Sequence, residues 1–503
     1  MQHQCRYIIM VCVLLLSGSF YRAQAQTTIK GKVVDAVSWQ PLESVSITDV
    51  HAQTVKTTTD QHGNFILKSG TELQFSAVGY KTLTTTVAAN SSNTIALQPE
   101  PLSLKNIVLE SNAATNTQEL LRLVPGLFIA QHAGGGKAEQ IFLRGFDVDH
   151  GTDVKVSFDG MPVNMVSHAH GQGYADAHFI IPETVNNIDF GAGPYYAQHG
   201  DFNTAGYVSF ASFKNISNSR IQLEGGRFNS FRTLAMLDLI KKNKDKQSAY
   251  LAADFNYTDG PTVAKQNFKR LNLFGKYNFS ITENTKLTAS VSTFTSKWNA
   301  SGQVPDRAVN DGTISLFGSI DPTEGGNTER HNANLVITHQ FTNGANWENQ
   351  AFYSRYKFNL YSNFTFFLND PVNGDEIQQA ESRNIFGYAT KLNHKYFFRN
   401  KTLYSVYGAG LRLDATKDSR LSNVVTRKFL SDIKLGNIKE TNLYAFMQQQ
   451  LNTGKWLFDA GVRVDYFNFS YLDKLNAVQQ PSQQKAIVSP KLNIQYTINK
   501  QVQ

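Results

Sequence analysis

Apolar and polar residues alternate along much of the second half of the chain. In residues 456–466, one set of positions is Trp456, Phe458, Ala460, Val462, Val464 and Tyr466, and the other is Leu457, Asp459, Gly461, Arg463 and Asp465. Residues 271–279 repeat the pattern, with Phe274 as the exception. Because successive side chains of a strand point to opposite faces, one face meets an apolar phase and the other meets water. The pattern predicts transmembrane antiparallel strands over residues 216–503.

The connections between these segments alternate in length. Tight polar turns are predicted at residues 242–246, 282–285, 343–346, 399–402 and 452–454, and longer polar loops near 258–267, 299–329, 360–382, 417–436 and 472–484. Outer-membrane barrels alternate short periplasmic turns with longer extracellular loops. A soluble sandwich has no reason to sort its connections in this way, so the spacing favours a barrel in lipid.

The first 25 residues have the features of a secretory signal. Arg6 supplies a positive charge, residues 8–16 form a short apolar core, and Ala23-Gln24-Ala25 is a small-residue cleavage site. Both cysteines of the chain, Cys5 and Cys12, lie in this signal. The rest of the chain therefore has no disulfide and no thiolate site.

Residues 26–98 predict a β-sandwich. Short strands are expected at residues 28–34, 44–49, 54–59, 64–67 and 72–77, with turn residues between them. The phrases Gly31-Lys32-Val33-Val34-Asp35, Gln40-Pro41-Leu42-Glu43-Ser44-Val45, Gly63-Asn64-Phe65 and Gly79-Tyr80 resemble the carboxypeptidase-regulatory-like domain. The resemblance implies an accessory module without a catalytic group.

The formal net charge of +8 is weak evidence for nucleic acid. No long basic run, zinc-ligand spacing or helix-turn-helix pattern accompanies it, so we expect no nucleic-acid partner. The chain also lacks H-E-x-x-H, G-x-S-x-G and the kinase motifs, so we do not expect an enzyme.

Residues 119–215 contain four short phrases in a fixed order, which are Leu121-Arg122-Leu123-Val124-Pro125-Gly126-Leu127, Leu143-Arg144-Gly145-Phe146, Phe158-Asp159-Gly160 and Gly191-Ala192-Gly193-Pro194. They resemble the plug domain of a TonB-dependent outer-membrane receptor. The resemblance implies a small α+β plug inside the barrel, a place in the outer membrane of a Gram-negative bacterium, and a TonB-type inner-membrane energy complex as partner. Ala192 and His199-Gly200 depart from the usual plug pattern, which indicates a subfamily.

Residues 99–118 are predicted to be a linker, interrupted by Ile107, Val108 and Leu109. This phrase fits a TonB box, an extended segment that adds as a strand to the edge of a partner's sheet. It fits equally well the last strand of the sandwich or the first strand of the plug, since aliphatic residues favour strands in general.

Counting the alternating segments gives roughly 12 strands, whereas plugged transporter barrels have about 22. An open barrel edge in lipid leaves unpaired backbone groups, which is costly. The end at Gln503 also lacks the terminal aromatic residue of the family. We therefore expect a fragment whose barrel is incomplete.

Two plug loops are expected to face outward and touch the solute. Their candidate contacts are Gln131, His132, Gly134, Gly135, Gly136 and Lys137 in the first loop, and Ser167, His168, His170, Gln172 and Tyr174 in the second. His168 and His170 point the same way on an extended segment, and His178 and His150 could complete a metal-binding cluster. The alternative is that these histidines only hydrogen-bond within a glycine-rich loop or stack on an organic ligand.

The expected function is TonB-dependent uptake of a scarce solute, with a metal chelate such as a ferric siderophore as cargo and no resident cofactor. A vitamin or an oligosaccharide is an alternative cargo. A surface β protein that does not transport, such as an adhesin or a signalling receptor, is the alternative from another class; the phrase at Ile107–Leu109 argues against it.

Overall fold

The computed structural model describes residues 28–498 except for 37–38, 40, 44, 51–53, 68–71, 78–79, 81, 89–91, 98–105, 109–116, 132–134, 149–150, 172, 241–245, 399–400, 454 and 497. The predicted signal, residues 1–25, lies outside the described residues. The chain forms two compact units, which divide between Ser103 and Leu104. No helix in the described part is both long and apolar enough to cross a membrane.

The first unit is the expected β-sandwich. Its strands are β1 (Ile29–Asp35), β2 (Ser46–Asp49), β3 (Thr54–Thr58), β4 (Asn64–Leu67), β5 (Glu72–Ser76), β6 (Leu83–Thr86) and β7 (Ser92–Leu97). They form one sheet in the order β4-β1-β7 and another in the order β3-β2-β5-β6. Apolar side chains of both sheets, among them Val33, Ile47 and Phe75, form the core. Five strands match the prediction closely, and β6, which is rich in Thr, and β7 were not predicted.

The second unit begins with the plug. Its elements are β8 (Asn106–Val108), α2 (Thr117–Arg122), β9 (Leu127–Ala130), β10 (Gln140–Leu143), β11 (Phe146–Asp147), β12 (Val154–Phe158), β13 (Met161–Pro162), β14 (Asn164–Met165), β15 (Tyr174–Ala175), η1 (Pro182–Thr184), β16 (Val185–Ala192) and β17 (Gly206–Ser212). A five-stranded mixed sheet has the order β13-β12-β17-β16-β8, with β12 and β17 parallel. The expected α+β plug is confirmed.

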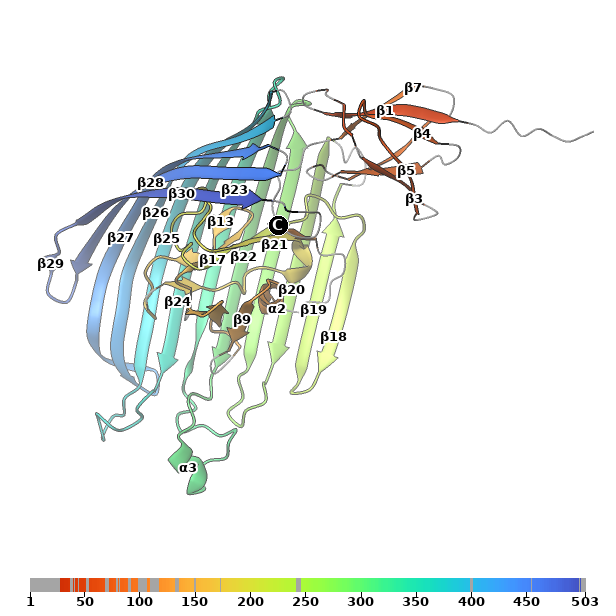
Figure 1. Ribbon diagram of the computed structural model, residues 1–503. Coiled ribbons are helices and arrows are strands. Elements are labelled where there is room, and N and C mark those ends of the chain that lie inside the picture. Colours follow the sequence, from red (N-terminus) through yellow and green to blue (C-terminus); the bar gives the residue numbers. More distant parts are fainter. Residues whose placement is uncertain are drawn as a thin grey trace, which may run out of the picture. The chain divides into compact units, whose positions relative to one another are not determined.

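The remaining strands form one large antiparallel wall (Figure 1). They are β18 (Arg220–Gly226), β19 (Ser230–Asp238), β20 (Gln247–Thr258), β21 (Phe268–Ser280), β22 (Thr285–Asn299), β23 (Gly325–Gln340), β24 (Asn346–Ser362), β25 (Ile377–Phe398), β26 (Lys401–Val425), β27 (Lys428–Asn452), β28 (Trp456–Asp473), β29 (Val478–Gln479) and β30 (Gln483–Tyr496). Each strand pairs with the next one in sequence, except that β30 skips the two-residue β29 and also pairs with β28. The 13 strands agree with the predicted count of roughly 12.

The connections largely follow the predicted alternation. The long connections after β20, β22 and β24 lie at one end of the wall, and the one after β22 carries a short helix, α3 (Asp306–Asn310) (Figure 1). The prediction of a loop at residues 417–436 is wrong. Strands β26 and β27 extend through these residues and are joined by a turn at Thr426-Arg427. Each of these strands has 25 residues, whereas about 9–11 span a bilayer. Their outer halves lie in water on both faces, which removes the alternation that marks a strand.

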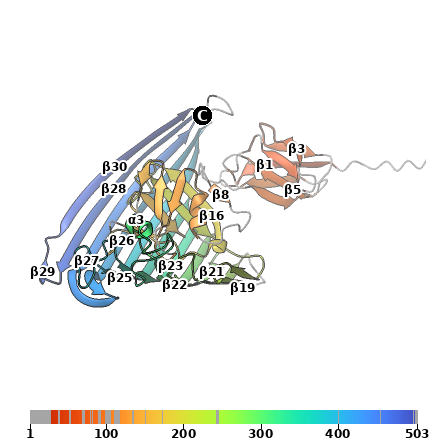
Figure 2. The same cartoon turned by 90° about the horizontal axis from the view of Figure 1, so that it is seen from below.

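The wall curves around the plug, whose strands β8 and β16 lie within the curve (Figure 2). The turn Asp159-Gly160 joins β12 to β13 with both residues at positive φ. Its tip reaches the wall, where Lys276 Nζ lies 3.1 Å from Asp159 Oδ2 and Gln350 Nε2 donates to the Asp159 carbonyl at 2.8 Å. A Cβ on Gly160 would lie 2.3 Å from the Gln350 side chain. Glycine therefore lets this turn press against the wall.

A buried ion-pair group forms the strongest link between plug and wall. Glu183, in η1, accepts two hydrogen bonds from the Arg232 guanidinium of β19, at 2.7 and 2.8 Å. Arg232 Nε donates to Asp254 at 2.8 Å, and Asp254 also accepts from Arg270 at 2.7 Å. Arg232 and Glu183 are each only 3% exposed. Such a bidentate pair is strong, and the loss of one partner leaves a charge buried without compensation.

Glu183→Gln is expected to weaken plug retention by about 3–5 kcal/mol, because it removes the carboxylate from a buried pair. Thermal unfolding of the detergent-solubilised protein measures the loss. Glu224→Gln is the matched control, since Glu224 contacts the same guanidinium at 3.0 Å but its side chain is 32% exposed; about 1 kcal/mol or less is expected there. Equal losses of stability in Glu183→Gln and Glu224→Gln would contradict the expectation that the buried contact contributes more than the exposed one.

Candidate functional site

A cavity of about 550 Å³ lies between the plug and the first wall strands. The plug contributes α2, the end of β9 with the loop after it, and His178, and the wall contributes β18–β21 with their connections. The lining includes the connection after β20, residues 259–267, so the cavity lies at the end of the wall that carries the long connections. In a barrel of this kind that end is extracellular.

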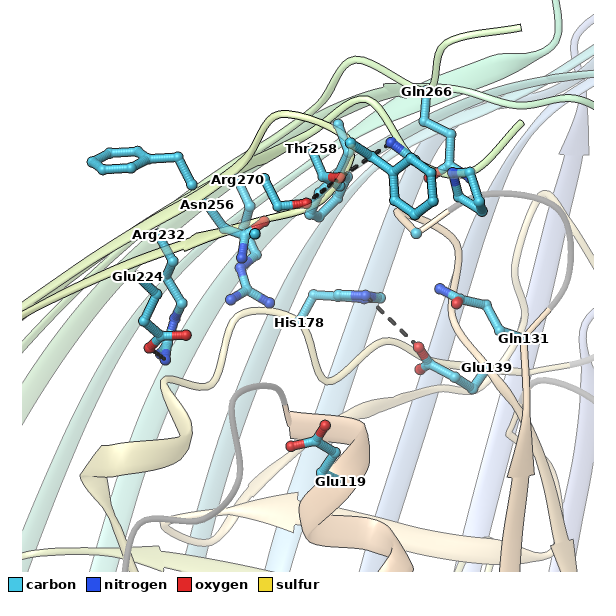
Figure 3. Close-up of a pocket in the computed structure, with 18 of the residues that line it drawn as sticks. Glu119, Gln131, Glu139, His178, Glu224, Arg232, Asn256, Thr258, Gln266 and Arg270 are labelled. Atoms are coloured by element: carbon cyan, nitrogen blue, oxygen red, sulfur yellow. Dashed lines mark hydrogen bonds and ion pairs between the residues drawn. The ribbon is translucent and has the colours of Figure 1, made fainter. Parts of the chain in front are cut away.

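The lining combines charges of both signs with amides and aromatic rings. Its labelled residues include Glu119, Gln131, Glu139, His178, Glu224, Arg232, Asn256, Thr258, Gln266 and Arg270 (Figure 3). Phe228, Phe231 and Phe268 add apolar surface. Ligand pockets typically measure about 300–1,000 Å³ and pair apolar surface with a few placed polar groups. The arrangement suits reversible binding of a small polar solute.

His178 is the central polar group on the plug side of this cavity. Its Nδ1 lies 2.7 Å from Asp176 Oδ1, and its Nε2 points toward Glu139, 3.8 Å away (Figure 3). Burial disfavours the charged imidazolium, but the carboxylates of Asp176 and Glu139 outweigh burial and raise the pKa of His178. The ring is thus held between two carboxylates, hydrogen-bonded to Asp176 and at ion-pair distance from Glu139. Asn272 Nδ2 fixes the backbone by donating to the His178 carbonyl at 2.8 Å.

The first predicted solute loop reaches this cavity. Gln131 and Gly135 line it, while His132 and Gly134 lie outside the described residues. Gly136 lies in a turn and packs closely on the wall, because a Cβ there would lie 2.2 Å from the Trp298 ring. Gly136 lets the loop pack on β22. Lys137 acts electrostatically on Glu324, next to β23.

The second predicted loop packs against the wall strands β24 and β25 and does not line the cavity. His168 stacks on Tyr174, with ring centroids 4.2 Å apart, and its Nε2 lies 3.1 Å from the Tyr356 hydroxyl. His170 Nδ1 lies 2.8 Å from Gln379 Oε1. Arg383 of β25 donates to the Ser167 carbonyl. Gln172 lies outside the described residues.

These contacts bear on the predicted metal site. The backbone N–H of His170 donates to His168 Nδ1 at 3.1 Å, so the lone pair of that nitrogen is engaged and its proton is on Nε2. Among the described residues, no group of three or more His, Cys, Asp or Glu side chains could hold a metal ion. His150 lies outside them. Metal ligation by His168, His170, His178 and His150 stays a prediction, and the observed contacts are those of the alternative, hydrogen bonding within the loop.

The two loops meet inside the plug. The backbone N–H of Ala138, which follows the first loop, donates to the Tyr174 hydroxyl at 2.8 Å. Tyr174 in turn stacks on His168. The loop at the cavity is therefore connected to the loop on β25 through one buried tyrosine.

The linker phrase lies on the plug sheet. β8 pairs antiparallel with β16, with Ile107 opposite Ile188 and Val108 opposite Asn187. It is the terminal strand of that sheet, which corresponds to the alternative of a first plug strand. Leu109 lies outside the described residues. The TonB-box role of Ile107–Leu109 stays a prediction.

Sequence reasoning missed Glu183, Arg232, Asp254 and Arg270. The signal for the last three was present, because they occupy polar positions of strands β19, β20 and β21, where alternation places them on the inner face. Glu183 had no such signal, since it lies in a three-residue helix whose place against the wall depends on the tertiary structure.

Family models match three parts of the chain. The TonB-dependent Receptor Plug Domain matches residues 102–207, the TonB dependent receptor-like beta-barrel matches residues 292–503, and the CarboxypepD_reg-like domain matches residues 29–109. The matched order is that of the sandwich, plug and wall described above.

Solved structures share the fold. The unliganded ferric citrate transporter FecA has a TM-score of 0.67 and 13% identity over 79% of this chain and 60% of its own. The siderophore receptor PirA from Acinetobacter baumannii has a TM-score of 0.56 and 16% identity over 79% and 59%. The copper transporter OprC has a TM-score of 0.57 and 13% identity over 77% and 58%. This chain thus spans about 60% of the length of FecA.

The plug and the wall are matched both by family models and by solved folds, so the chain belongs to the TonB-dependent receptors of the Gram-negative outer membrane and carries a CarboxypepD_reg-like domain before its plug.

Proposed function

We propose that this chain takes part in TonB-driven uptake of a small solute across the outer membrane, and that the solute is a metal chelate such as a ferric siderophore. The observation that carries the proposal is the cavity of about 550 Å³ on the extracellular side of the plug. The plug forms its floor through Gln131 and Gly135, so a bound solute touches the element that must move for uptake.

The chemistry of the lining supports this cargo class. A chelate presents oxygen acceptors around a metal whose own ligand positions are filled, so it needs hydrogen bonds and aromatic contacts from the protein, not metal ligands. Gln131, Asn256 and Gln266 supply amides, and Phe228 and Phe231 supply rings. Several proteins of similar fold are named for siderophores, ferric citrate or copper. A vitamin or an oligosaccharide would use the same kinds of contact. A binding experiment therefore has to distinguish these cargo classes.

The energy-coupling step is proposed at β8. This strand has three residues and is the terminal strand of its sheet. Few hydrogen bonds must break to release it, and each contributes only about 0.5–1.5 kcal/mol net. Once released, Ile107 and Val108 offer an extended backbone that a TonB-type partner pairs with by strand addition. A protein that only adheres has no use for such a segment.

Filling the cavity tests the solute site. Gly135→Trp is expected to abolish solute binding, because Gly135 lines the cavity and has room for a side chain, with the nearest atoms 3.8 Å from where a Cβ would lie. Gly171→Trp is the matched control, since Gly171 lies on the second loop with no atom within 4 Å of such a Cβ and does not line the cavity. Binding of ferric siderophores to whole cells or purified protein is measured. Normal binding by Gly135→Trp would place the solute elsewhere.

Val108→Pro tests the coupling step. Proline removes a backbone donor and fixes φ, so strand addition should fail. Uptake of radiolabelled iron chelate is expected to fall to the level of cells without TonB, while surface binding persists. Val108→Ile keeps both backbone and β-branching and should import normally. Uptake by Val108→Pro at the normal rate would exclude residues 107–109 as the TonB box.

A further inference from the structure

Buried polar atoms that lack a hydrogen-bond partner gather on three neighbouring strands of the wall. They are Arg270 Nε and Asn272 Oδ1 on β21, Ser296 Oγ and Trp298 Nε1 on β22, and Thr328 Oγ1 on β23. Each of the five residues is at most 5% exposed, and none of these atoms has a partner within the described part of the chain. These five residues are termed the unpaired patch.

The strand register brings the members of the patch together. Arg270 is the Cα partner of Ser296, and Ser296 is the Cα partner of Thr328, so the three form one row across the wall. Directly opposed residues have Cβ atoms roughly 4.5–5.5 Å apart. Asn272 and Trp298 each lie two positions from this row, and residues two apart on a strand share a face. The five residues therefore form one continuous surface.

Unpaired atoms are scattered on strands β24–β28. In the described part of those strands they are Thr416 Oγ1, Arg420 Nε and Asn468 Oδ1, and none of the three residues is opposite another in the register. A buried hydroxyl of β24, that of Ser354, donates to Asn332 at 2.6 Å. The unpaired patch is thus a local feature of β21–β23 and not a general property of the inner face.

The patch begins at the extracellular cavity and extends away from it. Arg270 lines that cavity together with Asn256, its Cα partner on β20 (Figure 3). Ser296 and Thr328 continue the same row but are not part of the cavity lining. A solute in the cavity therefore lies beside polar groups that it does not yet reach.

The plug covers these groups at two points. Asn272 Nδ2 donates to the His178 carbonyl of the plug at 2.8 Å. The plug residue Gly136 packs on the Trp298 ring so closely that a Cβ at this glycine would lie 2.2 Å from it. Both contacts have to separate if the plug moves away from β21–β23, and that movement uncovers the patch.

The sequence keeps these polar groups although the closed state does not use them. A buried polar atom without a partner is costly, because it gives up hydrogen bonds to water and gains none. Ser296→Ala or Thr328→Val would remove the cost at nearly constant volume. Local rules of this kind are broken mainly where function requires it, so the patch is suited to a state in which the plug has moved.

We propose that the unpaired patch is a second solute site, which the solute reaches from the extracellular cavity when the plug moves away from β21–β23. This inference rests on the proposed function, because it needs a solute that passes between plug and wall. The first cavity captures the solute, and the patch supplies its next hydrogen bonds.

The chemistry of the patch defines the groups that it binds. Arg270 Nε and Trp298 Nε1 donate, Asn272 Oδ1 accepts, and the hydroxyls of Ser296 and Thr328 do both. These atoms match uncharged hydroxyl, amide and carbonyl groups on the outside of a solute.

Charge has a minor part in this recognition. Arg270 is the single charged residue of the patch, and Asp254 already balances it at 2.7 Å. The patch itself contains no carboxylate, imidazole or thiolate, so it offers a bare metal ion no strong ligand.

The first test is thermal unfolding of the purified full chain in detergent, which needs no solute. Ser296→Ala and Thr328→Val are expected to leave the unfolding temperature unchanged or to raise it by roughly 1–3 °C, because each removes an unpaired group. Ser354→Ala is the matched control and should lower it, since this buried hydroxyl donates to Asn332. A fall in Ser296→Ala and Thr328→Val as large as that in Ser354→Ala would show that the hydroxyls brace the closed plug, which overturns the proposal.

The second test separates capture of the solute from its passage. Surface binding and import of radiolabelled ferric citrate, a ferric hydroxamate, cyanocobalamin and a malto-oligosaccharide are measured in cells with the wild type or with Ser296→Ala/Thr328→Val. For the solute that the wild type imports, the double variant should bind with unchanged Kd, because neither residue lines the cavity. Its maximal import rate is expected to fall roughly three- to tenfold, as hydrogen bonds to the passing solute are lost. Ser354→Ala should import at the wild-type rate.

The outcomes distinguish the second site from the function on which it rests. Equal import rates in the wild type and in the double variant would overturn the second site alone. Weaker surface binding with an unchanged maximal rate would also overturn it, because the two hydroxyls would then belong to the first cavity. A wild type that imports none of the four solutes would contradict the proposed function and, with it, the second site.

Discussion

The inner face of the wall has to be polar, because the outer face lies in lipid and the two faces alternate along every strand. Along β23–β28 the plug therefore meets guanidinium groups as well as a few apolar side chains, among them Phe358, Leu360 and Ile385. Four wall arginines donate to plug backbone carbonyls, namely Arg330 to Pro162, Arg383 to Ser167, Arg412 to Asn164 and Arg463 to Ala197. Each arginine is held by an acceptor two residues away on the same face of its own strand: Asn332, Glu381, Asp414 and Asp465.

This arrangement bears on the proposed uptake, which requires a path to open beside the plug. Hydrogen bonds to carbonyls are exchanged for water at a small net cost, about 0.5–1.5 kcal/mol each, and the arginines keep their in-strand partners when the plug moves. On the first wall strands, Leu234, Met236, Phe274 and Phe294 join the apolar core of the plug. The buried Glu183–Arg232 pair adds an ionic contact there. The plug is thus held by apolar contacts on both halves of the wall, by a buried ion pair on β19 and by exchangeable hydrogen bonds on β23–β28.

The sequence predicted the parts of this structure that depend on local pattern. Alternation located the wall strands, because it is set by neighbours in the chain. The loop predicted at residues 417–436 was wrong. The strands there extend beyond the bilayer, where nothing requires apolar and polar residues to alternate. The Glu183–Arg232 pair could not be predicted, since it joins residues 49 positions apart in the sequence. The cavity could not be predicted either, since its lining runs from Glu119 to Arg270. The histidine loop was recognised as a special segment, but its packing on Tyr356 and Gln379 depends on β24 and β25.

The proposed uptake requires that solute binding outside the plug be followed by movement of the plug against the wall. A disulfide between Ala197→Cys and Gly461→Cys tests this most directly, because a Cβ at Gly461 would lie 2.9 Å from the Ala197 Cβ and a small shift gives the roughly 3.5–4.5 Å of a disulfide. The natural cysteines, Cys5 and Cys12, both lie in the predicted signal. The oxidised protein is expected to bind solute normally without importing it, and reduction should restore import. Import at the wild-type rate with the disulfide intact would show that the plug need not move against the wall.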